Sequence, residues 1–99
     1  MTIFHITPLR KWREALESGM YSADSLVKEG FIHCCTKSQV EGVIKAWFRG
    51  ESDLILLEIE PALLSAEVKY EDSHGTGELF PHVYGPLNLD AVIRATVCA

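Results

Sequence analysis

The chain has 99 residues, of which 47% are hydrophobic and 23% charged, as is typical of one globular domain spanning residues 1–99. Its net charge is −5 and no basic cluster is larger than Arg10, Lys11 and Arg13, which disfavours nucleic acid as a partner, so none is expected. The longest apolar run, Leu54–Leu57, is far too short to cross a bilayer, so no membrane partner is expected either.

The first predicted elements are a strand and a helix. Residues 2–6 alternate and are rich in β-branched and aromatic types, which predicts a strand. Thr7 is expected to cap the helix that follows, with Pro8 at its first position. Apolar residues then recur at helical spacing as far as Gly19, which is expected to end the helix.

Two more helices and a short strand follow. Ser22 is expected to cap a helix over residues 23–28, and residues 31–34 predict a brief apolar strand. Thr36 and Gln39 form the T-x-x-Q pattern of a capping box, which marks the start of another helix. Gly50 is expected to end this helix. Its apolar stripe consists of Val40, Val43, Ile44, Trp47 and Phe48.

The second half of the chain is rich in predicted strands. Residues 53–60 predict a strand buried on both faces, residues 66–71 a half-exposed strand, and residues 91–98 a final alternating strand. Residues 79–84 predict a short strand that Pro81 places at a sheet edge or a bulge. The predicted fold class is therefore α+β.

Three cysteines are an odd number, and the adjacent Cys34 and Cys35 are poor candidates to bridge each other. We therefore expect reduced thiols in a cytoplasmic protein. His33 precedes this pair, but neighbouring strand residues point to opposite faces, so Cys34 is not expected to be activated by His33. Buried, unreactive thiols are the prediction for both positions.

The segment of residues 72–87 is the strongest candidate for a functional site. Gly75 and Gly77 allow unusual backbone geometry, while Pro81 and Pro86 restrict it, and shaped loops of this kind commonly carry function. Glu78 lies between the glycine turn and an aromatic strand. Its carboxylate is suited to orient a substrate or to stabilise developing positive charge.

The four histidines are candidates for ligand contacts. His5 and His33 lie in predicted strands, where each either bonds a backbone carbonyl or points into a shared cleft that holds a ligand hydroxyl. His74 is expected in a solvated turn. His82 either anchors the loop through a hydrogen bond or contacts a ligand.

A metal site is a further alternative. His74, Glu78 and His82 are spaced four residues apart, and imidazole with carboxylate suits zinc or iron. The intervening glycines and proline exclude the helix on which this spacing would place the three side chains on one face, and the H-E-x-x-H pattern is absent. No metal is therefore expected.

Three motifs are similar to those of a known family: FHIT near the N-terminus, GFIHC before the capping box, and HGTGELFPHVYGPL in the candidate segment. Through these motifs the chain resembles, over nearly its whole length, the small uncharacterised family called domain of unknown function 952. The resemblance implies a compact fold similar to the ADP-ribosyltransferases. It would have a split, mostly antiparallel sheet, two main helices and a cleft for nicotinamide adenine dinucleotide (NAD).

The same resemblance implies roles for individual residues. That superfamily holds NAD with a first-strand histidine or arginine, a second-strand aromatic residue or serine, and a later glutamate. By this comparison His5, followed by Thr7, contacts a ribose, and His33 clamps the nicotinamide where tyrosine or serine is usual. Glu78 would be the main catalytic carboxylate, with His5 and His33 as its catalytic partners. Further ligand contacts are expected from His82 and Tyr84.

Three hypotheses about function result. The first is an ADP-ribosyltransferase-like enzyme that transfers or cleaves ADP-ribose from NAD. The second is a non-catalytic module that binds a nucleotide or another small molecule, which the departure at His33 favours. The third is a metal-dependent enzyme that uses His74, Glu78 and His82. The first two place a small molecule in the cleft, and the sequence does not predict the oligomeric state.

Overall fold

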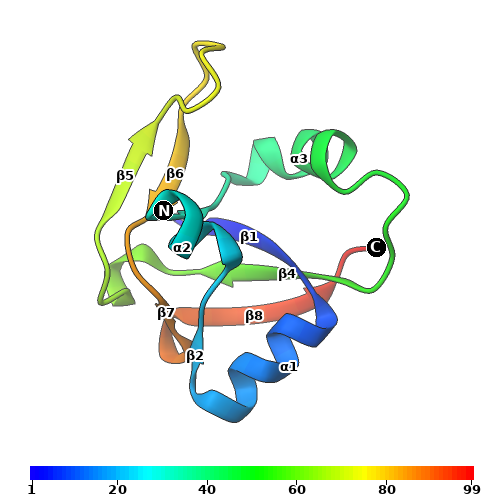
Figure 1. Ribbon diagram of the computed structural model, residues 1–99, viewed down its shortest axis with the longest axis vertical. Coiled ribbons are helices and arrows are strands. Elements are labelled where there is room, and N and C mark those ends of the chain that lie inside the picture. The colour runs from blue at the N-terminus through cyan, green and yellow to red at the C-terminus, as the bar shows by residue number, and fades with distance from the viewer.

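Strands and α-helices alternate in the first half of the chain, and strands follow in the second half, in the computed structural model, which describes residues 1–99 (Figure 1). The strands are β1 (Ile3–Pro8), β2 (Met20–Tyr21), β3 (Ile32–His33), β4 (Leu54–Ile59), β5 (Val68–Glu71), β6 (Phe80–Val83), β7 (Leu87–Asn88) and β8 (Val92–Val97). The α-helices are α1 (Leu9–Ser18), α2 (Asp24–Glu29) and α3 (Val40–Trp47), with short 3-10 turns at Lys37–Gln39, Pro61–Leu63 and Leu89–Ala91. No helix is both long and apolar enough to cross a membrane.

All strand pairs are antiparallel and form three separate sheets, in the orders β1-β4-β8, β2-β7 and β3-β6-β5. The α+β class and the divided antiparallel sheet are therefore confirmed. The Cα radius of gyration is 12.5 Å, which agrees with the value of about 13 Å for a compact domain of about 100 residues.

The central strand of the first sheet is β4, which pairs with β1 on one side and β8 on the other. This position explains its continuous apolar sequence, because a central strand covered on both faces has little need for polar residues. Leu54, Ile55 and Leu57 are buried, and Leu56 is half-buried. The predicted burial of this strand is confirmed.

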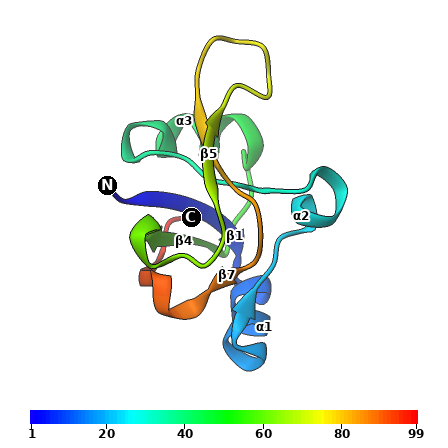
Figure 2. The ribbon, with the colours of Figure 1, turned by 90° about the vertical axis from the view of Figure 1, so that its left-hand side faces the viewer.

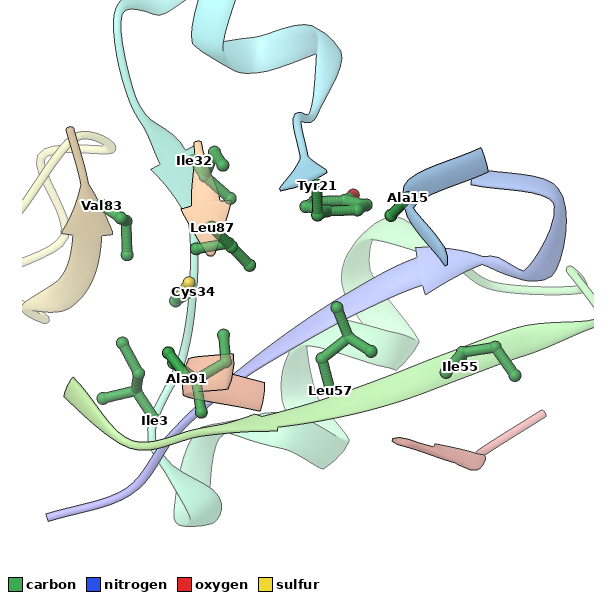
Figure 3. Close-up of a cluster of buried hydrophobic side chains, with 11 residues drawn as sticks. Ile3, Ala15, Tyr21, Ile32, Cys34, Ile55, Leu57, Val83, Leu87 and Ala91 are labelled. Atoms are coloured by element: carbon green, nitrogen blue, oxygen red, sulfur yellow. The ribbon is translucent and has the colours of Figure 1, made fainter. Parts of the chain in front are cut away.

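The core lies between this sheet and the short strands that face it (Figure 3). Leu57 and Ile55 of β4 face Ile32 of β3 and Leu87 of β7 across the core, and all four side chains are buried. Each fully buried aliphatic side chain contributes about 1.5–3 kcal/mol through removal of apolar surface from water. The two layers are therefore held together by hydrophobic contact across the gap between separate sheets.

The strands β5 and β6 form a hairpin that projects from the body of the protein, with residues 72–79 at its tip (Figures 1 and 2). Pro81 was expected at an edge or bulge, but it lies in β6, the central strand of its sheet. Its carbonyl accepts from the backbone N–H of Cys34 at 3.0 Å. In an antiparallel sheet the N–H and C=O of one residue point towards the same neighbouring strand. The N–H that Pro81 lacks would therefore have pointed towards the end of β3, so no hydrogen bond between β6 and β5 is lost.

Two predicted helix caps are wrong. Thr7 belongs to β1 and is buried, and the extended Pro8 precedes α1 without a side-chain cap. Ala23, not Ser22, precedes α2, again without a side-chain cap. The hydroxyl of Thr7 is used in a buried bond to Tyr21, which accounts for its absence from the helix end.

The capping box is confirmed, with the side chains of Thr36 and Gln39 each bonded to the other residue's backbone. It opens a 3-10 turn that leads directly into α3. Gly19 and Gly30 end the first two helices in the left-handed conformation, with φ values of 85° and 88°. Both α3 and β1 contribute residues to the site described next.

Candidate functional site

One cavity of about 370 Å³ lies where β1, β3, α3 and the β5–β6 hairpin meet. All four histidines of the chain contribute to its lining, together with aromatic residues and one carboxylate, whereas no lysine or arginine does. The residues that line this histidine pocket are Phe4, His5, Ile6, Glu29, His33, Cys34, Cys35, Val43, Trp47, Phe48, His74, Phe80 and His82.

The apolar stripe of α3 forms one wall of the pocket. Val43, Trp47 and Phe48 line the cavity, and no residue of α3 is fully buried. The stripe was predicted from its helical spacing, but it covers a cavity and not a closed core. Trp47 remains 62% exposed, which leaves its ring available to stack on a ligand.

His5 belongs to the innermost wall, and its ring is fully bonded inside the protein. Nδ1 bonds the carbonyl of His33 at 2.6 Å, and Nε2 bonds the hydroxyl of Tyr21 at 2.7 Å. Burial lowers the pKa of His5 to about 4, so the ring is neutral at pH 7. Its single proton lies on Nδ1, because a carbonyl can only accept a hydrogen bond.

The position of this proton determines the direction of the other hydrogen bonds in the network. Nε2 of His5 is an acceptor, so the Tyr21 hydroxyl donates to it, and burial raises the pKa of Tyr21 to about 12. The hydroxyls of Tyr21 and Thr7 are 2.8 Å apart, so the remaining proton is donated by Thr7 to Tyr21. Neither ring nitrogen of His5 is left for a ligand, and Thr7 does not line the pocket.

His33 reaches the pocket from β3 and is half-exposed. Its Nε2 lies 2.8 Å from the carboxylate of Glu29, the last residue of α2. Both side chains are partly exposed, so the pair contributes about 0–1 kcal/mol to stability. Glu29 is the one carboxylate that lines the pocket, and it places negative charge beside the ring of His33.

His82 lies on β6 directly opposite His33 of β3, and the two ring centroids are 5.4 Å apart. Nδ1 of His82 bonds Glu71 at 2.9 Å, and the same carboxylate oxygen accepts from the Tyr84 hydroxyl. The bond from Tyr84, followed by that from His82, lowers the pKa of Glu71, and the bond to Glu71 raises the pKa of Tyr84. Phe31 stacks on the ring of His82 with centroids 4.0 Å apart.

The outer rim of the pocket is formed by His74, at the tip of the hairpin. Its ring stacks on Trp47 of α3 with centroids 5.3 Å apart. Asp72 shapes the tip by accepting backbone N–H groups of His74, Thr76 and Gly77 at 3.2, 3.1 and 2.6 Å. These bonds, that from Gly77 foremost, lower the pKa of Asp72. Asp72 is therefore the acceptor that orders the loop.

A sequence model of the family described as protein of unknown function (DUF952) matches residues 6–95. The chain belongs to this family. A crystal structure of protein CC0527 from Caulobacter crescentus is similar, with 33% identity and a TM-score of 0.88, over 98% of this chain and 85% of CC0527. The solution NMR structure of CC0527 gives 33% identity and a TM-score of 0.84, over 97% and 83% of the two chains.

No curated protein matches the chain. Neither DUF952 nor CC0527 is named for an activity. The membership predicted from the three motifs is confirmed, and the likeness to ADP-ribosyltransferases remains a prediction.

In this DUF952 member, Glu78 lies outside the histidine pocket. Its side chain is exposed and accepts from the amide of Gln39 at 3.1 Å. Gln39 also donates to the carbonyl of Leu79 at 2.9 Å, which ties the end of the hairpin tip to the start of α3. Glu78 was expected to open a strand that faces the histidines, but β6 begins two residues later, at Phe80.

Tyr84 also lies outside the pocket, where it bonds Glu71. The structure therefore brings His33, His74 and His82 together and leaves Thr7, Glu78 and Tyr84 outside the lining. His5 joins the wall with its ring nitrogens already bonded.

The geometry gives the metal alternative no support. No three His, Cys, Asp or Glu side chains are grouped so that they could hold a metal ion, and His74, Glu78 and His82 form no such group. The hairpin tip separates them, because the glycine turn replaces the helix that would have aligned their side chains.

The two cysteines of the pocket are unsuited to nucleophilic chemistry. Burial raises the pKa of Cys34 strongly and that of Cys35 to about 12, so both stay protonated at pH 7. Both side chains are buried, as expected.

The residues that sequence reasoning missed are Glu29, Trp47 and Phe48 as lining residues, and Glu71 as the partner of His82. The aromatic pair gave a detectable signal, since a helix with two large aromatic residues at its end offers a stacking wall. Glu29 and Glu71 gave no signal in the sequence, because each contacts its histidine only after the strands are aligned.

Proposed function

We propose that the histidine pocket binds a small molecule through a planar nitrogen-containing ring that is neutral or cationic, with the nicotinamide end of NAD as the first candidate. The observation that carries this proposal is the lining itself: four imidazoles, aromatic rings and Glu29, without any lysine or arginine. Such a wall favours stacking and positive charge, and it contains no lysine or arginine to neutralise an anion.

The size of the pocket supports a ligand of this kind. Its volume of about 370 Å³ falls near the lower end of the range of about 300–1,000 Å³ for small-molecule sites. This space suits one ring with its substituents better than a whole dinucleotide. The nicotinamide ring of oxidised NAD carries a positive charge, which Glu29 and the face of Trp47 can stabilise. The phosphates of NAD would then remain outside, in solvent.

Cleavage or transfer of ADP-ribose is a second candidate function, and the position of Glu29 favours it. Breaking the bond between nicotinamide and ribose develops positive charge on the sugar, so a nearby carboxylate lowers the barrier. Glu78 is turned towards Gln39, whereas Glu29 lines the pocket beside His33. In this version of the hypothesis, Glu29 takes the role that the resemblance gave to Glu78.

The binding proposal is tested by titrating the protein with NAD while backbone amide shifts and tryptophan fluorescence are followed. We expect shifts at His33, Trp47 and His74, and weaker binding by about tenfold in Trp47→Ala, since stacking on an aromatic ring contributes about 0.5–1.5 kcal/mol. Leu16→Ala is the matched control, because Leu16 is an exposed apolar residue on α1 outside the pocket. No shifts at these positions at millimolar NAD would refute the proposal.

The role of Glu29 is tested with Glu29→Gln in two measurements. Preference for oxidised over reduced NAD should fall, because only the oxidised ring is cationic, and any release of nicotinamide should fall with it. If the ratio of affinities for oxidised and reduced NAD is the same in wild type and Glu29→Gln, then Glu29 does not act on the ring. Binding without nicotinamide release in the wild type would leave a binding module and exclude the cleavage hypothesis.

A further inference from the structure

His82 carries an unsatisfied hydrogen-bonding atom in the wall of the pocket. The residue is 1% exposed, and its Nε2 is fully buried without a hydrogen-bond partner. It is the one buried side-chain nitrogen or oxygen atom in the protein with none. A buried polar group without a partner costs about 1–3 kcal/mol, so such an atom calls for an explanation.

Glu71 determines what this atom can do. A carboxylate only accepts, so Nδ1 of His82 must donate to Glu71, and a neutral ring then carries a lone pair on Nε2. The Tyr84 hydroxyl donates to the same oxygen of Glu71 and holds the carboxylate in place. With a neutral ring, the pair of Glu71 and His82 presents a hydrogen-bond acceptor of fixed direction.

The position of the ring directs this acceptor towards the pocket side. His82 lines the pocket, whereas Glu71 and Tyr84 do not, so a ligand in the pocket can approach the ring from the side away from Nδ1. Phe31 covers one face of the ring. Nε2 is therefore the ring nitrogen that remains for a ligand in the pocket.

We propose that Nε2 of His82 accepts a hydrogen bond from an N–H group of the ligand, and that the ligand class is a planar ring with a carboxamide or amino substituent. In NAD this group is the carboxamide NH₂ of nicotinamide. The inference rests on the proposed function, because it names the contact that selects the ring bound in the same pocket.

His33 is the side chain that gives access to this acceptor. The atom is closed to solvent in the ligand-free protein, and the ring of His33 packs edge-on against His82 with centroids 5.4 Å apart. An ion pair to Glu29, of a kind that contributes about 0–1 kcal/mol, and an edge-on contact with Phe31, with centroids 4.9 Å apart, hold His33 in place. Displacing the ring of His33 costs these contacts, and the new bond between Nε2 and the ligand offsets that cost.

The test compares NAD with its 3-acetylpyridine analogue, in which a methyl group replaces the carboxamide NH₂ and the ring is kept. We expect the wild type to bind NAD about five- to tenfold more tightly, as the loss of one hydrogen bond predicts. The imidazole ¹⁵N signals of His82 should report a proton on Nδ1, and Nε2 should shift when NAD binds but not when the analogue binds.

His82→Phe provides the decisive variant. Phenylalanine keeps a ring that can stack on Phe31 and removes Nε2, so the preference for NAD should disappear. Tyr70→Phe is the control, since it removes one polar atom from an exposed ring of β5 outside the pocket. Its preference should equal that of the wild type.

The outcomes separate the two proposals. If NAD and the analogue bind equally and Nε2 does not shift, then a buried water satisfies His82 and this inference is wrong, while the ring-binding pocket stands. If neither compound binds, both proposals are wrong. A wild-type preference that survives in His82→Phe would also overturn the inference, because the selectivity would come from another group.

Discussion

The inner and outer walls of the histidine pocket differ in how their polar groups are bonded. On the inner wall, His5 is buried and its two ring nitrogens are bonded to His33 and Tyr21. On the outer wall, His74 is exposed and meets Trp47 through ring contact alone. The inner wall therefore fixes the shape of the site, whereas the outer wall is free to change when a ligand enters.

The largest expected effect concerns the inner wall and acid. The pKa of His5 falls from 6.5 in the unfolded chain to about 4 in the folded protein, so between these values only the unfolded chain binds the proton. Stability should therefore decrease as the pH falls from about 7 to about 4, by about 3 kcal/mol from His5 alone. Urea unfolding at several pH values in this range measures the slope.

The variant His5→Phe separates this effect from the acid response of the carboxylates. It should be less stable than wild type at pH 7 by about 2–3 kcal/mol, because the carbonyl of His33 and the hydroxyl of Tyr21 lose their partner. Its stability should then change less with pH. His74→Gln, which removes an exposed histidine, should keep the wild-type slope. A wild-type slope in His5→Phe would contradict the assignment of a neutral, buried ring.

A smaller effect is expected where the outer wall is anchored. Gln39→Ala removes the bonds to the backbone N–H of Thr36, to Glu78 and to the carbonyl of Leu79. We expect a loss of about 1 kcal/mol, as for other helix caps, with faster amide exchange at residues 72–79. Lys37→Ala, an exposed position in the same 3-10 turn, should leave exchange at the tip unchanged. Unchanged exchange in Gln39→Ala would mean that Asp72 alone orders the tip.

The smallest effect is expected for Glu78→Gln. Since Glu78 is exposed and lies outside the pocket, NAD affinity should change by less than about twofold, as for other surface charges. Titration by fluorescence is sufficient to measure this. A tenfold loss would show that the hairpin tip moves to bring Glu78 over the ligand, and it would restore the role implied by the resemblance to ADP-ribosyltransferases.

Local signals in the sequence predicted most of the fold. The capping box at Thr36, the stop at Gly19 and the apolar run of β4 each act over a few residues, and all three are confirmed. The predicted stop at Gly50 is wrong, because α3 ends at Trp47. Thr7 shows the limit of such reasoning. Its sequence context suits a helix cap, but a buried tyrosine hydroxyl competes for the same side chain and decides its place.

The candidate site was predicted in part, for a related reason. His33 and His82 were named, and their approach follows from strand alignment that places them directly opposite each other. Glu71 and Glu29 could not be assigned, because their contacts depend on the β5–β6 register and on the packing of α2 against β3. A one-residue slip in the hairpin would turn Glu71 away from His82. The residue types alone do not determine that register.

The pairing of strands far apart in the chain has a consequence for folding. The pocket requires β1 beside β4 and β3 beside β6, so its walls meet only after long loops have closed. No fragment made from the first half of the chain contains His74, His82 or the hairpin. Ligand binding by this small domain is therefore a property of the completely folded chain, and bound ligand would slow unfolding of both layers together.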